Sequence, residues 1–360
     1  MFEPPGPGYE MTSRRDIIQR LGFAFAVGFA LTGGFVNGWC YGWADELESG
    51  STAEEVKDAD MTDTKAPQPG APTLGGMQFW GDVCFFQGYR IQRHVLTGHF
   101  RLLDKNNRRY QSGTIEDCRK MLDRIRTSHN LKPDIGHAVI YLHGIGRTSR
   151  SMRPIIDAMP TDGFVHVPFE YPSTRVPIEQ AAGYLHSTIE SLTDVSKISF
   201  VVHSMGGLVV RGYLKDHSDP RLYRMVMLGT PNNGAELADM LRQNMIFRAV
   251  YGPATQDLVT DLNGTIGTLP IPTFEFGVIV GGRGDERGFN PLLVGDDDGA
   301  VTVSSARLAG ASDFLRISKL HSLLMSDETA IAAVKCFLEH GRFSMNREPA
   351  PIVKETAACR

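Results

Sequence analysis

From residue 131 onward, short apolar runs alternate with amphipathic stretches. The apolar runs have the length of buried strands and cover residues 137–142, 164–168, 197–202, 223–228, 274–280 and 313–317. Between them, apolar residues recur at helical spacing over residues 149–159, 177–192, 206–216 and 326–339. This alternation is typical of a mostly parallel sheet with helices on both faces. We therefore predict an α/β domain over residues 131–341, followed by a C-terminal tail at 342–360.

Residues 77–130 have a different pattern, in which aromatic and β-branched clusters are interrupted by polar turns. The clusters around Phe86 and Phe100 predict two or three antiparallel strands. Thr114 and Asp117 then have the spacing of a helix-capping pair, and an amphipathic run follows them. We predict a small module, a β-hairpin plus a helix, that packs beside the α/β domain and to which no chemistry is assigned.

The longest uncharged stretch of the chain runs from Leu21 to Ala44. As a helix its 24 residues would measure about 36 Å, enough to cross a hydrocarbon core of roughly 30 Å. Arginines precede it at positions 14, 15 and 20, and acidic residues follow it at positions 45, 46 and 48. Positive charge on the N-terminal flank predicts that residues 1–20 stay in the cytoplasm and that the body of the chain is extracytoplasmic.

Three interpretations of this stretch remain open: an uncleaved transmembrane anchor, a cleaved signal peptide and a buried core helix. Its length, the aromatic residues at its end and the lack of a clear A-x-A cleavage site favour the anchor. Arg14 and Arg15 also resemble a twin-arginine export signal, although Ile17 stands where that signal favours Phe. We predict a membrane-anchored protein, with export after signal cleavage as the alternative.

Residues 45–76 separate this stretch from the module. They carry eight acidic side chains before residue 64 and three prolines after it, with almost no large apolar residues. Such a segment cannot bury enough surface to fold, so we predict a flexible linker.

Composition and charge exclude some classes of function. A hydrophobic content of 42% in 360 residues is enough for a sizeable core, while a net charge of −4 with scattered Lys and Arg argues against nucleic acid as a partner. The five cysteines lie far apart and none has a spacing that suits zinc, so we predict no metal site. Two states remain open for Cys84 and Cys118 of the module, a disulfide or free thiols.

The strongest chemical motif is a serine just after the predicted strand 197–202. Ser204 is followed by Met205 and the small Gly206, and an amphipathic stretch begins there. A strand, a serine among small residues and a helix are typical of a nucleophile elbow, whose strained turn disfavours bulky neighbours. Val202 departs from the pattern, because a small residue is expected two positions before the serine.

A nucleophilic serine needs a base and an orienting acid, which follow an elbow in the order Ser, acid, His. His321 follows the last predicted strand, and Asp298 follows the strand before it. Both positions suit loops at the carboxyl ends of strands, where open α/β sheets bind their ligands. Asp296 and Asp297 remain rivals for the acid, and Asp298 is favoured because Gly and an apolar residue follow it directly.

A tetrahedral intermediate also needs backbone N–H donors for its oxyanion. One is expected from Met205, directly after the serine, and the other from Ile145, in the loop after the predicted strand 137–142. The residues predicted to support these two loops are His143, Gly144, His203 and Gly206.

These motifs resemble those of lipase-type α/β hydrolases, which include small bacterial lipases and the related GPI inositol-deacylase-like group. The resemblance spans about residues 136 to 340 and rests on segments 142–146, 203–207, 228–234, 298–306 and 321–324. It implies an α/β-hydrolase fold and a serine hydrolase that cleaves carboxylic esters, commonly of lipids or acyl chains, through an acyl-serine intermediate and without a cofactor. In that mechanism His321 takes the proton of Ser204 while Asp298 holds the imidazole.

Other functions remain open. The same triad serves thioesterases and acyltransferases, and a catalytically silent relative would bind a ligand or protein at the membrane surface. Residues 235–270, rich in Leu, Met and Phe, are either an apolar lid over an acyl pocket or a helix packed on the core. We predict an ester or lipid substrate, no nucleic acid, and membrane contact through residues 21–44; the pattern does not indicate an oligomeric state.

Overall fold

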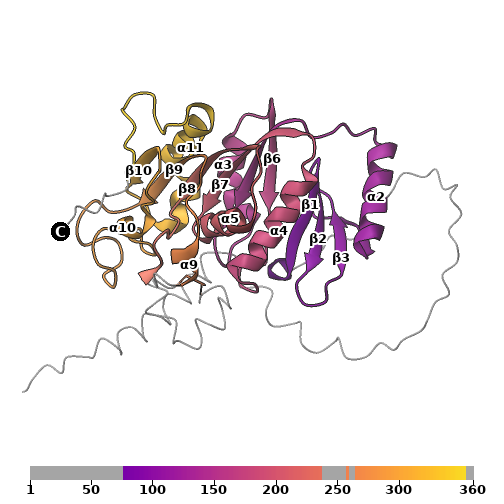
Figure 1. The fold of residues 1–360 in the computed structure, drawn as a ribbon, viewed down its shortest axis with the longest axis horizontal. Helices are drawn as coiled ribbons and strands as arrows, with labels where there is room; N and C mark the ends of the chain where they lie inside the picture. The colour runs from indigo at the N-terminus through magenta and orange to yellow at the C-terminus, as the bar shows by residue number, and fades with distance from the viewer. Residues whose placement is uncertain (1–75, 237–256, 259–263, 354–360) are drawn as a thin grey trace, which may run out of the picture.

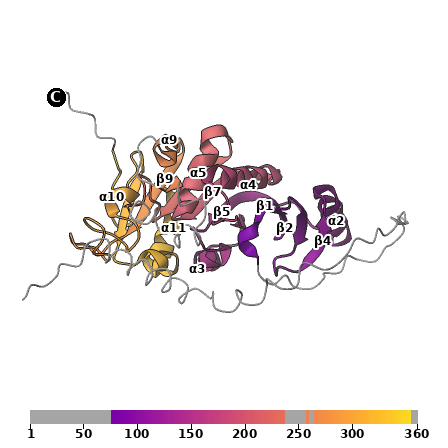
Figure 2. The ribbon, with the colours of Figure 1, turned by 90° about the horizontal axis from the view of Figure 1, so that it is seen from below.

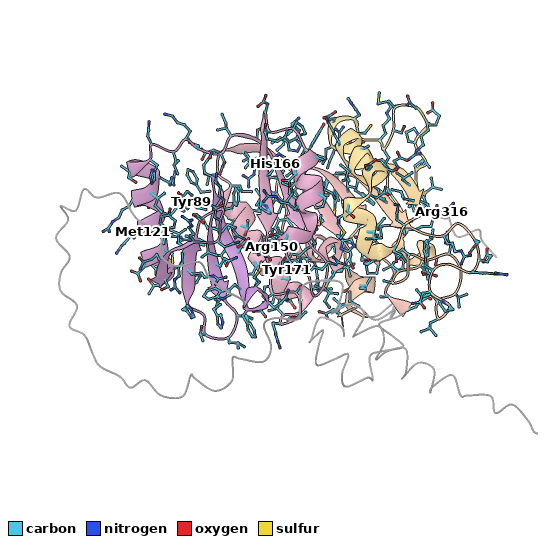
Figure 3. All side chains as sticks on the ribbon, turned by 180° about the vertical axis from the view of Figure 1, so that it is seen from behind. Tyr89, Met121, Arg150, His166, Tyr171 and Arg316 are labelled. Carbon is cyan, nitrogen blue, oxygen red and sulfur yellow. The ribbon has the colours of Figure 1, made fainter. Side chains whose placement is uncertain are left out.

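Two β-sheets of different kinds form the framework of the protein. The computed structural model describes residues 76–236, 257–258 and 264–353. Within these residues the larger sheet has six strands and the smaller one has four, and they follow one another along the molecule (Figure 1). Met121, beside the small sheet, and Arg316, in the large sheet, mark opposite ends of this arrangement (Figure 3).

The larger sheet is parallel throughout. Its strands are β5 (Gly136–Leu142), β6 (Phe164–Phe169), β7 (Val195–His203), β8 (Leu222–Leu228), β9 (Glu275–Gly281) and β10 (Asp313–Ile317). Their order is β10-β9-β8-β7-β5-β6, so the chain enters at β5, moves out to β6 and returns to the other side of β5 for β7. The direction of winding therefore reverses at β5 and β7, and the carboxyl ends of these strands flank the crevice where such sheets bind ligands.

Apolar side chains on both faces of this sheet form two cores. The helical segments around it are η2 (Ser149–Met152), α3 (Arg153–Ala158), α4 (Ile178–Ser191), α5 (Met205–Asp216), α9 (Thr265–Thr268), α10 (Val303–Ala306), η3 (His321–Ser326) and α11 (Glu328–His340). Helices α4 and α5 cover one face, and α3 and α11 cover the other (Figure 2). Because successive side chains of a strand point to opposite faces, Ile140 and Tyr141 of β5 belong to different cores, and both are fully buried.

The smaller, antiparallel sheet and one helix form the N-terminal module. It contains η1 (Met77–Phe79), β1 (Trp80–Phe86), β2 (Tyr89–His94), β3 (Phe100–Leu103), β4 (Arg109–Gly113) and α2 (Ile115–Ser128). Strand β1 packs against α4 of the larger domain. Thr114 caps α2 as predicted, since its hydroxyl accepts from Asp117 N at 3.2 Å and the Asp117 carboxylate accepts from Thr114 N at 3.0 Å. The prediction of two or three strands missed β4, because Tyr110 is its only large apolar residue.

The structure confirms the elements predicted for the α/β domain. Each predicted strand matches a strand of the large sheet to within two residues at either end. The predicted helices at 177–192, 206–216 and 326–339 correspond to α4, α5 and α11, and the stretch at 149–159 is divided between η2 and α3. The fold is therefore α/β, with a parallel main sheet flanked by helices.

Other predictions fall on parts of the chain that the structure does not describe. These parts include the predicted membrane stretch at 21–44, residues 45–75 of the predicted linker at 45–76, and most of residues 235–270. Among the described helices, none combines the length and the apolar character needed to cross a membrane. Cys84 and Cys118 are both described and are free thiols, and burial raises the pKa of Cys118 to about 11.

Arg211 of α5 is bound to both ends of the chain segment that follows β8. Its guanidinium donates to Asn232 O at 3.0 Å, shortly before residues 237–256. It also donates to Leu269 O at 2.7 Å and Pro270 O at 3.0 Å, beyond that range. Arg211 is 3% exposed, and burial lowers its pKa to about 10. Both ends of the segment are thus fixed to the helix that starts at the elbow.

We expect Gly277→Ala to destabilise the fold. A Cβ at this position would lie 2.5 Å from Phe337 Cε2 and 2.6 Å from Phe343 Cζ, and both rings are buried. The rings would have to shift, at a cost of about 1–3 kcal/mol. The control is Gly183→Ala in α4, where a Cβ would meet nothing within 4 Å and the higher helix propensity of Ala should add about 1 kcal/mol. Free energies of unfolding measured with denaturant should therefore change in opposite directions, and equal effects would contradict this packing.

Candidate active site

Ser204 occupies a strained turn between β7 and α5. Its φ of 54° and ψ of −126° fall in a region that residues other than glycine rarely adopt, and such a conformation costs about 1–3 kcal/mol. Ser204 N donates to Leu228 O at 2.9 Å, and Ser204 O accepts from Gly207 N at 3.1 Å. Gly206 lets the helix start close to β5, because a Cβ there would lie 2.8 Å from Leu142 O. The backbone has the geometry of a nucleophile elbow.

Val202, the departure from the elbow motif, is accommodated by the core. It is fully buried on the face that α4 and α5 cover. In the sheet it lies opposite Leu142 of β5 and Met227 of β8. The β-branched side chain therefore packs among apolar neighbours on the covered face of the sheet.

His321 and Asp298 are in contact at the carboxyl edge of the large sheet. His321 Nδ1 is 2.7 Å from Asp298 Oδ2, and His321 N donates to Asp298 O at 2.8 Å. The other carboxylate oxygen accepts from Ala300 N at 3.0 Å and Val301 N at 2.8 Å. Asp298 is fully buried, so both of its oxygens are satisfied by protein donors. With a carboxylate as its partner, Nδ1 carries the proton and Nε2 keeps a free lone pair.

The two rival acids have other partners. Asp297 accepts from two backbone amides, at 3.0 and 2.6 Å, and burial raises its pKa. Asp296 accepts from Gly284 N at 3.0 Å and lies 3.4 Å from the guanidinium of Arg316. Among these three carboxylates, the one that hydrogen-bonds the imidazole in the described part of the chain is Asp298.

The imidazole of His321 lies beside the elbow. Gly229, with a φ of 58°, allows this approach, because a Cβ there would be 2.9 Å from His321 Nδ1. Gly229 follows Leu228, whose carbonyl binds Ser204 N. Within the described residues Ser204 Oγ and His321 form no hydrogen bond; in enzymes, catalytic hydrogen bonds often tighten only when substrate binds.

His203 contacts the loop that carries His321. It is 1% exposed, its ring centre is 4.6 Å from that of His321, and its Nε2 is 3.1 Å from His321 O. Because a carbonyl oxygen can only accept, Nε2 carries the proton. Burial, together with the charges of His321 and Arg147, holds the pKa of His203 well below its usual value. The ring therefore stays neutral near pH 7 and does not compete for the proton of the serine.

The backbone amides of Ile145 and Met205 are both unpaired near Ser204. Gly144 brings the first loop against the elbow, because a Cβ there would lie 3.0 Å from Ser204 Cβ. No group in the described part of the chain accepts a hydrogen bond from Ile145 N or Met205 N, although Met205 is 1% exposed. Met205 is the first residue of α5, and the first amides of a helix have no partner within it. Two free N–H groups near a serine can receive a developing negative charge.

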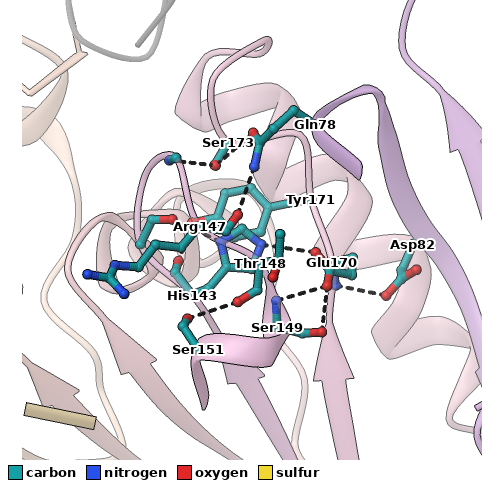
Figure 4. A network of polar contacts seen from close by, with 12 residues as sticks. Gln78, Asp82, His143, Arg147, Thr148, Ser149, Ser151, Glu170, Tyr171 and Ser173 are labelled. Atoms are coloured by element: carbon teal, nitrogen blue, oxygen red, sulfur yellow. Dashed lines mark hydrogen bonds and ion pairs between the residues drawn. The ribbon is translucent and has the colours of Figure 1, made fainter. Parts of the chain in front are cut away.

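The sequence predicted that His143 supports the loop of Ile145, but it did not identify the partners of His143, which are Glu170 and Tyr171. His143 is fully buried; its Nε2 lies 3.4 Å from Glu170 Oε2, and its carbonyl accepts from the Tyr171 hydroxyl at 2.6 Å (Figure 4). Burial tends to raise the pKa of Glu170, but the adjacent His143, the charge of Arg90 and a hydrogen bond from Ser149 bring it below its ordinary value. The sequence did contain a signal for Glu170 and Tyr171, because they follow the predicted strand 164–168 closely. The carboxyl ends of parallel strands are where such sheets place functional groups.

Comparisons with known proteins give distant likenesses only. No protein-family model matches the chain, and no curated protein is similar to it. Among solved structures, the chain is similar to the mature lipase BlEst2 of Bacillus licheniformis, with 18% identity and a TM-score of 0.44 over 59% of this chain and 94% of that one. It is similar to the metagenomic carboxyl esterase MGS0156, with 16% identity and a TM-score of 0.39 over 57% and 74% of the two chains. A lipase-esterase related protein from Clostridium acetobutylicum has 11% identity and a TM-score of 0.37 over 56% and 93%.

The names of those proteins assign no activity to this chain. Its own strand order, the elbow after β7, and the sequence order Ser204, Asp298, His321 are those of the α/β-hydrolase fold.

Proposed function

We propose that the protein is a serine hydrolase that cleaves carboxylic esters, with lipid or acyl esters as substrates, through an acyl-serine intermediate. The observation that carries the proposal is the buried Asp298–His321 pair next to a strained serine with two unpaired amides nearby. Each part alone has a structural explanation. Together they supply a nucleophile, a base, an orienting acid and an oxyanion site.

The proposed reaction begins at Ser204 Oγ. His321 Nε2 takes the hydroxyl proton as Oγ attacks the ester carbonyl, and Asp298 stabilises the imidazolium that forms. The carbonyl oxygen becomes an oxyanion and accepts from the amides of Ile145 and Met205. His321 then gives the proton to the departing alcohol. Water, deprotonated by the same imidazole, attacks the acyl-serine, and release of the acid returns the proton to Oγ.

Exposed apolar side chains around the base support an apolar acyl group. Leu320 and Leu323 lie on either side of His321 in the sequence and are 41% and 47% exposed. A Cβ at Gly299 would lie 3.3 Å from Leu320 Cδ2, which places this leucine beside the loop of the acid. Exposed apolar surface next to a catalytic group favours an apolar ligand. We therefore propose short to medium acyl esters as substrates, in preference to peptides.

Ser204→Ala should abolish hydrolysis of p-nitrophenyl esters and labelling by a fluorophosphonate probe, because the nucleophile is removed. We expect kcat to fall by at least ~10³-fold. Ser196→Ala is the matched control, since Ser196 is exposed on the same strand and donates to Gly136 O. A wild-type protein that neither labels nor cleaves any ester would overturn the proposal, and faster cleavage of the matching thioester would change the assignment to a thioesterase.

Asp298→Asn should lower kcat by about 10³- to 10⁴-fold, because the amide would no longer stabilise the imidazolium or hold its tautomer. Asp296→Asn is the control, since this carboxylate faces Gly284 and Arg316, and its kcat should stay within about threefold of the wild type. Steady-state rates on one p-nitrophenyl ester decide the matter. A larger loss in Asp296→Asn would show that the acid has been assigned to the wrong residue.

We also propose that residues 21–44 anchor the protein in a membrane, with the hydrolase on the extracytoplasmic side. The support is the sequence alone, since this stretch lies outside the described residues. The full-length chain should stay in the membrane fraction after an alkaline wash, and a variant without residues 1–44 should be released. Recovery of a soluble chain that begins near residue 45 would indicate signal cleavage instead.

A further inference from the structure

The loop that carries Ile145 is bound by the N-terminal module. Gln78, in η1, donates from Nε2 to Arg147 O at 2.7 Å. Its Oε1 accepts from Ser173 Oγ at 3.1 Å, and Ser173 Oγ in turn accepts from Gly146 N at 3.1 Å (Figure 4). One carboxamide therefore holds the backbone that follows Ile145 at two points.

The neighbours of this carboxamide also determine its orientation. Oε1 of Gln78 accepts from Thr174 N and from Thr174 Oγ1, each at 3.1 Å. Thr174 N can only donate and Arg147 O can only accept, so a reversed amide would lose the bonds to both of them. The side chain of Gln78 is thus held in one orientation. A fixed orientation is required if Gln78 is to position the loop that it binds.

The module reaches the other parts of the same loop through Glu170. Glu170 Oε1 accepts from Ser149 N at 2.8 Å, and its Oε2 lies 3.4 Å from His143 Nε2. Asp82 of β1 accepts from Glu170 N at 2.8 Å and donates from its own amide to Glu170 O at 2.9 Å. The loop between His143 and Ser149 is therefore attached to the module twice, directly by Gln78 and indirectly by Asp82.

We propose that Gln78 is a positioning residue for the oxyanion site, which makes the N-terminal module part of the active site. The inference rests on the proposed hydrolase function. The Ile145 amide has no hydrogen bond of its own among the described residues, so its direction depends on the bonds made by Gly146 and Arg147. A donor must lie about 2.7–3.1 Å from the oxyanion to stabilise it, and a small displacement of the loop therefore slows the chemical step.

The test is Gln78→Met, which keeps the length of the side chain and removes its hydrogen-bonding groups. We expect kcat for a p-nitrophenyl ester to fall by about 10- to 100-fold, with KM changed by less than about threefold. Gln111→Met is the matched control, because Gln111 lies on β4 of the same module and bonds the neighbouring Ser112 O. Its rates should equal those of the wild type.

A second readout separates positioning of the oxyanion site from a general loss of structure. Sulfur is a weak hydrogen-bond acceptor, so the wild type should cleave an ester much faster than the matching thionoester, in which sulfur replaces the carbonyl oxygen. Gln78→Met should reduce this ester-to-thionoester ratio by about threefold or more. A merely structural defect would lower both rates together and leave the ratio unchanged.

Ser173→Ala tests the same inference from the α/β domain, because it removes the acceptor of Gly146 N while leaving the module intact. Ser173→Ala should also lower the ester-to-thionoester ratio. If thermal unfolding shows that Gln78→Met is not folded, Ser173→Ala takes its place in the test. If the variant that is folded has the same kcat and the same ester-to-thionoester ratio as the wild type, the role of Gln78 is overturned while the hydrolase function stands. A wild-type protein without esterase activity would instead overturn the proposed function itself.

Discussion

The strained backbone at Ser204 is the constraint on which the arrangement of the site depends. A residue other than glycine keeps this conformation only where the surrounding structure holds it. Here β7 brings the chain in, α5 takes it away, and Leu228 O of the next strand binds the serine amide. The turn presents the hydroxyl at the switch point of the sheet, where Gly144 and Gly229 let the oxyanion loop and the imidazole approach.

Two buried carboxyl groups connect this centre to the rest of the molecule, and their environments differ. Burial raises the pKa of Asp82 to about 6, although the charge of Arg90 opposes the shift. For Glu170 the effect of burial is outweighed by the adjacent His143, the charge of Arg90 and a hydrogen bond from Ser149, so its pKa is lowered. When two neighbouring acids differ in this way, the one with the higher pKa takes up a proton first as the pH falls. Asp82 is therefore protonated before Glu170, the carboxylate that supports the oxyanion loop.

Most of the large domain could be predicted because its strands are buried on both faces and appear as uninterrupted apolar runs. Strand β4 could not, since an edge strand with one large apolar residue has no such run. The elbow and His321 could be predicted from the sequence because each follows a strand within a few residues. The choice among three adjacent aspartates followed from the residues after Asp298. The contacts of Gln78 could not be predicted, because they join residues far apart in the sequence, such as Gln78 and Arg147. Glu170 has the position of a functional residue just after a strand, but the sequence does not show its partners.

The guanidinium of Arg211 joins two stretches of chain that lie far apart in the sequence. It binds backbone carbonyls of Asn232 and Leu269, on either side of residues 237–256. A substitution at Arg211 would therefore remove hydrogen bonds from both stretches at once, on the helix that begins directly after the nucleophile.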